Sequence, residues 1–162
     1  MRSNIAAKKN APSFIYEILY GNPKYIRGRT VEHRQKLWKG VPVDEHVPTQ
    51  ALDELSEIQE IEMRSSCEGS GSENPTFLIF RFVNQLSEKE IETFVNGMNA
   101  IEDIHCGAGV GNMGVYRVGV TAPLWYEKDR DSFTTWWLEL PHKIKIVLEV
   151  SRVLASEFAD RY

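Results

Sequence analysis

The stretch Arg64-Ser65-Ser66-Cys67-Glu68-Gly69 lies between two runs that have the spacing of β-strands. In residues 58–63 apolar side chains recur at short spacing, and residues 76–83, which follow a Ser/Gly turn and Pro75, are apolar and aromatic. We predict a strand, a loop and a second strand. Hydroxyl groups, a thiol and a glycine would then lie where a strand ends in a loop, a place where proteins often present groups to a ligand.

Further elements are predicted on both sides of this pair. Helices are predicted at residues 49–58 and 88–98, the second because Ser87 and Glu90 have the spacing of a capping box, and a third is predicted to begin near Pro141. Short strands are predicted at 101–106 and 115–120, while residues 133–138 fit either a strand or the start of a helix. This order of elements predicts a mixed α/β fold, α+β-like, in which a single sheet is covered by helices.

The first 48 residues are predicted to form a basic N-terminal extension, and residues 49–162 the α/β domain. Positions 1–39 hold nine Lys and Arg residues against two acidic residues, although the whole chain carries a net charge of −4. Within the extension we predict a short helix from Thr30 to about Lys39 and a linker at residues 41–47. This charge asymmetry has two interpretations, a basic extension that binds the phosphates of RNA or one that packs on, or lies beside, the acidic remainder of the chain. The candidate nucleic-acid-binding residues are Lys24, Arg27, Arg29 and Arg34.

Length and composition narrow the class of protein. The chain has 162 residues, 42% of them hydrophobic, which suffices for one domain with a real core. No apolar run approaches the roughly 20 residues of a membrane helix, and no apolar stretch follows the first cations, so we predict a cytoplasmic protein with no membrane partner. Two cysteines make no disulfide framework, and no metal-ligand spacing is present, so no metal site is predicted.

The predicted loop around Cys67 has two interpretations. Arg64 is the nearest cation in the sequence that could activate the thiol, and a nucleophilic cysteine also needs a base. The sequence does not show whether His46, His105 or His142 reaches Cys67, so no catalytic residue is assigned. The other interpretation is a long hairpin loop with a buried, inert thiol.

The motif Ser65-Ser66-Cys67-x-Gly69 and the elements around it resemble the tRNA wybutosine-synthesizing protein 3 family, whose motif reads Ser-Ser-Cys-Ser-Gly-Arg. The resemblance covers about residues 49–123 in the order of elements. That family consists of S-adenosylmethionine-dependent methyltransferases acting on a modified guanosine in tRNA, so the resemblance implies an adenosyl cofactor and an RNA partner. This chain departs from the motif at two positions, where Glu68 replaces a serine and Ser70 replaces the arginine.

A second candidate site is the glycine-rich segment 107–114, which is predicted as a turn. Gly109-x-Gly111-x-x-Gly114 has the spacing of a dinucleotide-binding loop, but a strand-like run follows it where that motif needs a helix. We favour a flexible turn that lets a ligand or another strand approach closely. The candidate ligand-binding residues of the two sites are Arg64, Ser65, Ser66, Cys67, Gly69, Gly109, Gly111 and Asn112.

Three functions remain open from the sequence. The first is a domain that binds RNA or an adenosyl or nucleotide ligand, similar to the wybutosine tRNA methyltransferases. The second is a non-enzymatic protein-interaction or homo-oligomeric module, in which the aromatic pairs Trp125-Tyr126 and Trp136-Trp137 would supply contact surface. The third is a cysteine-dependent enzyme, which requires a histidine beside Cys67.

Overall fold

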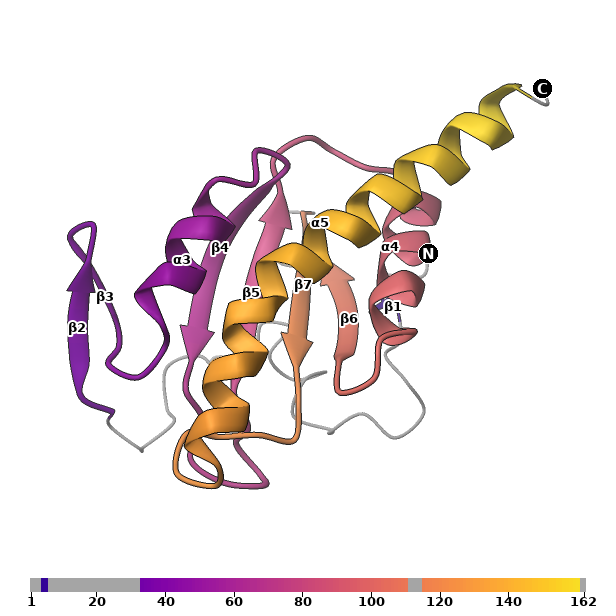
Figure 1. Ribbon diagram of the computed structural model, residues 1–162. Coiled ribbons are helices and arrows are strands. Elements are labelled where there is room, and N and C mark those ends of the chain that lie inside the picture. The colour runs from indigo at the N-terminus through magenta and orange to yellow at the C-terminus, as the bar shows by residue number, and fades with distance from the viewer. Residues whose placement is uncertain (1–3, 6–32, 111–114, 161–162) are drawn as a thin grey trace.

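The computed structural model describes residues 4–5, 33–110 and 115–160, and these residues form two sheets and three helices. Five strands make an antiparallel sheet in the order β1-β6-β7-β5-β4, with β1 at Asn4–Ile5, β4 at Ile61–Cys67, β5 at Phe77–Phe82, β6 at His105–Val110 and β7 at Tyr116–Thr121. Three helices pack against one face of this sheet (Figure 1), namely α3 (Thr49–Ser56), α4 (Glu88–Asn99) and α5 (Arg130–Asp160). The predicted mixed α/β fold is confirmed.

The hydrophobic core lies between the sheet and the three helices. Leu78 and Phe80 of β5 belong to it, and Phe80 meets Phe94 of α4 edge-to-face with ring centroids 6.0 Å apart. The alternate residues Phe77 and Ile79 are also buried, in a separate cluster against which Cys67 packs. Because both faces of β5 are buried, this strand has the nearly continuous apolar sequence that identifies it.

Helix α4 begins where the sequence predicts. Ser87 Oγ accepts a hydrogen bond from the backbone N–H of Glu90 (3.1 Å), and Glu90 Oε1 accepts one from the N–H of Ser87 (3.2 Å). This capping box satisfies two amide groups that the start of a helix leaves without partners. The predicted helix and its N-terminus are therefore confirmed.

Helix α5 begins at Arg130, well before Pro141, so the predicted start is wrong. Asp129 caps the helix, since its carboxylate accepts hydrogen bonds from the backbone N–H (3.1 Å) and the hydroxyl (2.8 Å) of Ser132. These bonds, the backbone one foremost, lower the pKa of the Asp129 carboxyl. Residues 133–138 are therefore helical, and the polar stretch before them includes the helix cap.

Pro141 lies inside α5 rather than in its first turn. A proline in a helix interior costs about 3 kcal/mol, and the burial of the neighbouring Leu140 and Ile144 offsets that cost here. The proline signal therefore misplaced the start of the helix. Although α5 has 31 residues, neither it nor any other described helix is long and apolar enough to cross a membrane.

The helix and linker predicted for residues 30–47 are also wrong where the structure describes them. A two-stranded antiparallel sheet is present instead, with β2 at Gln35–Trp38 and β3 at Val41–Asp44. Lys39 (φ 49°) and Gly40 (φ 79°) form its two-residue turn. Two successive positive φ values match the twist of a β-hairpin and are incompatible with a helix. Residues 30–32 lie outside the described part of the chain.

This hairpin is attached to the domain by side chains. Trp38 Nε1 donates a hydrogen bond to Asp53 Oδ1 of α3 (2.8 Å), and Lys36 Nζ donates one to the carbonyl oxygen of Val47 (2.6 Å). Val43 and Val47 are buried in the main hydrophobic core. Residues 33–48 therefore pack against the domain that begins at residue 49.

Candidate functional site

The polar residues Arg64 to Cys67, which the sequence analysis assigns to a loop, belong to strand β4. A bulge between Met63 and Ser65 shifts the pairing, so that Ser66 faces Leu78. Ser65 and Cys67 consequently lie on the opposite face of the sheet, away from the helices. The strand ends at Cys67, so the thiol does lie where β4 enters a loop.

Arg64 has a carboxylate partner of its own. Its Nη1 donates to Glu62 Oε1 (3.1 Å), while Nη2 of Arg81 donates to Glu62 Oε2 (2.8 Å). The two guanidinium groups, that of Arg81 foremost, hold the pKa of the Glu62 carboxyl below its ordinary value. Because Arg64 is paired with Glu62, the charged groups beside the Cys67 thiol come from other parts of the chain.

Gly69 starts a tight turn that returns the chain to β5. Its φ is +80°, and a β-carbon at this position would lie 2.6 Å from the backbone nitrogen of Thr76 and 2.8 Å from the carbonyl carbon of Pro75. The turn is closed by the N–H of Ser70, which donates to the carbonyl oxygen of Asn74 (2.7 Å). The backbone alone therefore requires glycine at this position of the motif.

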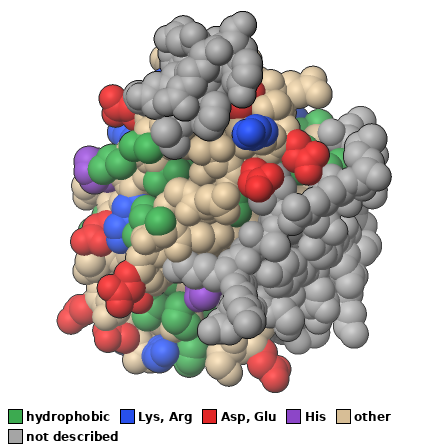
Figure 2. All heavy atoms as spheres, turned by 90° about the vertical axis from the view of Figure 1, so that its right-hand side faces the viewer, with side chains coloured by type: hydrophobic (Ala, Val, Ile, Leu, Met, Phe, Trp, Pro, Cys, Tyr) green, Lys and Arg blue, Asp and Glu red, His purple; other side chains and the backbone are tan. Residues whose placement is uncertain are grey.

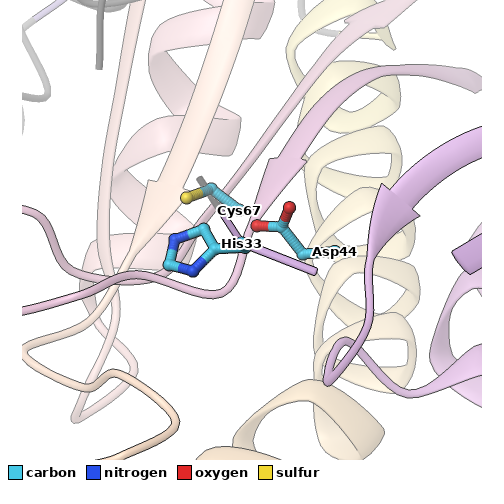
Figure 3. A group of neighbouring side chains, drawn as sticks. All are labelled: His33, Asp44 and Cys67. Atoms are coloured by element: carbon cyan, nitrogen blue, oxygen red, sulfur yellow. The ribbon is translucent and has the colours of Figure 1, made fainter. Parts of the chain in front are cut away.

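Five side chains that can titrate or bind metal gather beside the end of β4, and we call them the Cys67 cluster: His33, Asp44, His46, Cys67 and Glu68. Ligand atoms of His33, Asp44 and Cys67 lie within 4.8 Å of one another, and the three side chains point toward one another (Figure 3). The N–H of Glu68 donates to Asp44 Oδ2 (2.8 Å). Glu68 Oε2 lies 3.0 Å from His46 Nδ1 and 3.8 Å from His33 Nδ1.

The Cys67 cluster is polar but largely shielded from water. Asp44 is 8% exposed and Glu68 is 5% exposed. In the part of the chain that the structure describes, His33 Nε2 is buried without a hydrogen-bond partner. Buried carboxylates are stable when they are hydrogen-bonded, paired with cations or bound to a metal. Here Asp44 accepts the N–H of Glu68, and the carboxylate of Glu68 lies beside the imidazoles of His46 and His33.

The sequence predicts only part of this cluster. Cys67 is among the predicted ligand-binding residues and His46 among the candidate partners of the thiol, whereas His33 and Asp44 are not predicted. His142, another candidate, is exposed on α5. No spacing along the chain relates these residues, because the β2–β3 hairpin and the segment before it bring them to β4. The condition set for a cysteine-dependent enzyme, a histidine near Cys67, is met by His33.

The loop before α5 borders the cluster. Tyr126 stacks on His46 with ring centroids 3.6 Å apart and planes inclined by 7°. The Arg130 guanidinium lies 5.1 Å from the centroid of the Tyr126 ring, and Lys128 Nζ lies 5.0 Å from that of Trp125. Figure 1 shows that β4 and β7 end, and α5 begins, at the same end of the sheet. Two aromatic rings, each covered by a cation, therefore belong to a loop that contacts the cluster.

The glycine-rich segment is not a turn where it is described. Gly107 and Gly109 lie in β6, and Gly109 pairs with Arg117 of β7. Strands β7 and β5 lie between β6 and β4, so Gly109 and the candidate base His105 are not neighbours of Cys67 in the sheet. Residues 107–110 are extended because they pair with β7, so the turn predicted from the glycine content is wrong there. The other two candidates of this segment, Gly111 and Asn112, lie outside the described residues.

The predicted nucleic-acid-binding residues are only partly described. Lys24, Arg27 and Arg29 lie outside the described residues, whereas Arg34 is exposed and directly follows His33. On the face shown in Figure 2, acidic side chains are spread over the described surface with basic side chains dispersed among them. Three described cations lie over aromatic rings: Lys39 over Trp38 in the hairpin, Lys128 over Trp125 in the loop before α5, and Arg130, the first residue of α5, over Tyr126. Tyr126 stacks on His46 of the Cys67 cluster.

The two thiols have different environments. Cys106 on β6 is fully buried, and burial raises the pKa of its thiol above the ordinary value. Cys67 is partly exposed, and its sulfur accepts a hydrogen bond from the N–H of Gly69 at 3.4 Å. Reagents and ligands can therefore reach Cys67 more readily than Cys106.

Thr76 links Cys67 to the core. Trp137 Nε1 donates to Thr76 Oγ1 (2.9 Å), which donates to the carbonyl oxygen of Cys67 (2.6 Å). Thr76→Val keeps the side-chain shape but removes both bonds, so we expect the free energy of unfolding to fall by about 2–4 kcal/mol in urea denaturation. The control is Thr93→Val, which removes an exposed hydroxyl on α4. It should change the free energy of unfolding by less than about 0.5 kcal/mol. Equal losses in the two variants would contradict this role of Thr76.

Comparisons of this chain with protein-family models, with curated proteins and with solved structures find no significant match. They leave the resemblance of Ser65-Ser66-Cys67-x-Gly69 to the wybutosine family as a prediction. A function must therefore be argued from the groups that meet at the end of β4.

Proposed function

We propose that this chain is an RNA-binding domain that holds a nucleotide or an adenosyl ligand beside the Cys67 cluster. The proposal extends the resemblance of the Ser65-Ser66-Cys67-x-Gly69 motif to the wybutosine tRNA methyltransferases. Its structural support is the loop before α5, because that loop combines exposed cations with aromatic rings next to the cluster.

The single observation that carries the proposal is the pairing of Lys128 with Trp125 and of Arg130 with Tyr126. Proteins that bind single-stranded nucleic acid combine aromatic rings, on which bases stack, with cations that contact the phosphates. Stacking contributes about 1–3 kcal/mol per base, and phosphate contacts by Lys and Arg supply most of the sequence-independent affinity. Both kinds of group occur here within six residues of the chain.

S-adenosylmethionine is the ligand that the resemblance implies, and two features of the site suit it. Its sulfonium and ammonium groups give it a net positive charge, which the buried carboxylate of Glu68 can compensate. The His46 ring stacks on Tyr126 with one face and its side chain is 36% exposed, so its other face would stack on a purine. When bound, this cofactor would supply the methyl group. The residues of the chain would bind it and orient the acceptor base, and we assign no residue as a proton acceptor.

The proposal is tested by measuring the affinity of the full chain for unmodified tRNA over a series of salt concentrations. We expect the logarithm of the binding constant to fall linearly with the logarithm of the salt concentration, because bound phosphates release counterions. A double variant, Lys128→Gln with Arg130→Gln, should weaken binding at every salt concentration and reduce the slope by about 1–2. The matched control is Lys145→Gln, which removes an exposed lysine from the same helix, α5, farther along the chain.

Salt-insensitive binding, or equal effects of Lys145→Gln and of the double variant, would contradict the proposal. So would the absence of binding. If RNA binding is absent and the mass in sedimentation rises with protein concentration, the alternative of a homo-oligomeric module is favoured. Its contact surface would then be sought at Ile146 and Val150, two exposed apolar residues of α5.

A further inference from the structure

We propose that the Cys67 cluster binds a divalent transition metal, with zinc as the best fit, through His33, Asp44 and Cys67. The inference does not rest on RNA binding, because its ligands are His33, Asp44 and Cys67 and none of them belongs to the segment 125–130. It goes beyond the sequence analysis, which predicted no metal site because no ligand spacing is visible along the chain.

The donor set matches the chemistry of zinc. An imidazole nitrogen, a carboxylate oxygen and a thiolate sulfur are the three ligand types that zinc takes from proteins, and three protein ligands leave a fourth position open for water or substrate. With bonds of about 2.0–2.3 Å, tetrahedral ligand atoms lie about 3.3–3.8 Å apart. The ligand atoms of His33, Asp44 and Cys67 already lie within 4.8 Å of one another. Side-chain shifts of about 1 Å would therefore complete the site.

The three ligands come from positions where such shifts are possible. His33 precedes β2, Asp44 is the last residue of β3, and Cys67 is the last residue of β4. In Figure 3 a ring nitrogen of His33 faces the sulfur of Cys67, and the Asp44 carboxylate reaches toward the same place from the other side. None of the three side chains is held in the middle of a strand.

The second observation is the hydrogen bonding around these ligands. His33 Nε2 is buried and lacks a hydrogen-bond partner within the described part of the chain, which is a costly state that a metal ion would relieve. His33 Nδ1 lies 3.8 Å from Glu68 Oε2, and Asp44 Oδ2 accepts the N–H of Glu68. Metal-binding carboxylates and histidines are usually oriented by outer groups of this kind; here Glu68 donates a hydrogen bond to Asp44 and places its carboxylate beside the His33 ring.

Charge supports the same conclusion. Asp44 and Glu68 are both buried, and a coordinating Cys67 thiolate would add a third negative charge. A divalent cation beside them compensates this charge, whereas without it the imidazoles of His33 and His46 are the nearest compensating groups. The same atoms could serve a cysteine-dependent enzyme, but a metal bound to the sulfur would make the thiol unavailable as a nucleophile. The metal-site proposal therefore predicts that zinc slows the reaction of Cys67 with thiol reagents, whereas a cysteine-dependent enzyme predicts a reactive Cys67 that zinc does not protect.

The test uses the full chain, freed of metal by a chelator, and Zn²⁺ alone as the probe. We expect one equivalent to bind and to slow alkylation of Cys67 at least about tenfold, with Cys106 protected by burial in either state. Co²⁺ should give a sulfur-to-cobalt absorption band. Cys67→Ser should abolish that band, and Glu68→Gln should weaken metal binding about 10–100-fold. The control is His142→Gln, which removes an exposed histidine on α5 and should leave metal binding unchanged.

Three results would overturn the proposal. The first is wild-type protein that binds no stoichiometric metal, and the second is a Cys67→Ser chain that binds the metal as tightly as wild type. Rapid alkylation of Cys67 that zinc does not slow would also overturn it and would favour the cysteine-dependent enzyme. Because two of these outcomes, the metal stoichiometry and the alkylation rate of Cys67, are measured on the wild-type protein, the proposal stays testable even where a variant fails to fold. RNA binding is measured separately and with other variants, so a failure of the metal proposal can be told from a failure of the RNA proposal.

Discussion

Trp137→Ala is expected to lower the free energy of unfolding by about 3–5 kcal/mol, the range seen when a large buried aromatic side chain is truncated. Trp137 is fully buried, packs edge-to-face on Trp136 with centroids 5.3 Å apart, and donates its indole N–H to Thr76 Oγ1. The variant loses apolar contacts, leaves a cavity beneath α5 and removes a donor from Thr76. Since domains of this size are stable by roughly 5–15 kcal/mol, the variant would lie close to unfolding.

The measurement is urea denaturation followed by circular dichroism, with Leu138→Ala as the control. Leu138 is the next residue of α5 but is 36% exposed, so its truncation should cost less than about 1 kcal/mol. If the two variants lost the same stability, the inward face of α5 would be assigned incorrectly.

Gly69→Ala should also be strongly destabilising, by about 2–4 kcal/mol. An alanine at φ +80° has a strained backbone. Its β-carbon would also lie 2.6 Å from the backbone nitrogen of Thr76, and this clash cannot be relieved by moving a flexible side chain because the neighbouring atom belongs to the backbone. The turn must therefore open, which would disturb Cys67 on one side and Thr76 on the other. Thermal and urea denaturation measure the loss of stability.

Gly71→Ala provides the matched control for this glycine. Gly71 lies in the same loop, but a β-carbon there meets nothing within 4 Å and its backbone does not require glycine. We expect Gly71→Ala to change the free energy of unfolding by less than about 0.5 kcal/mol. A Gly69→Ala chain as stable as Gly71→Ala would show that the turn has another backbone conformation.

Elements with one strong local signal could be predicted from the sequence. The apolar run of β5 reports a strand buried on both faces, and the Ser87–Glu90 capping box identifies the start of α4. The start of α5 could not be predicted, because Pro141 is a local helix-start signal that tertiary burial overrides. The β2–β3 hairpin was missed because its turn, Lys39-Gly40, lacks the asparagine or aspartate that usually precedes glycine.

The site was less predictable than the fold, because its residues meet only through tertiary structure. Cys67 stood out in the sequence, but His33 and Asp44 carry no signal of their own. The role of Glu68 also could not be predicted from the sequence. As a departure from the wybutosine motif it counts against that resemblance, yet in the structure its N–H and carboxylate contact Asp44, His46 and His33. Its role depends on groups that no linear spacing relates to it.

The hydrogen bonds that run from Trp137 through Thr76 to Cys67 have a consequence for recognition. They attach the end of β4 to Trp137, the largest fully buried side chain among the described residues, so the carbonyl of Cys67 is held in place before any partner binds. A molecule that binds there meets a surface that is already formed. Association consequently loses little conformational entropy of the protein, and a modest number of contacts can suffice for selective binding.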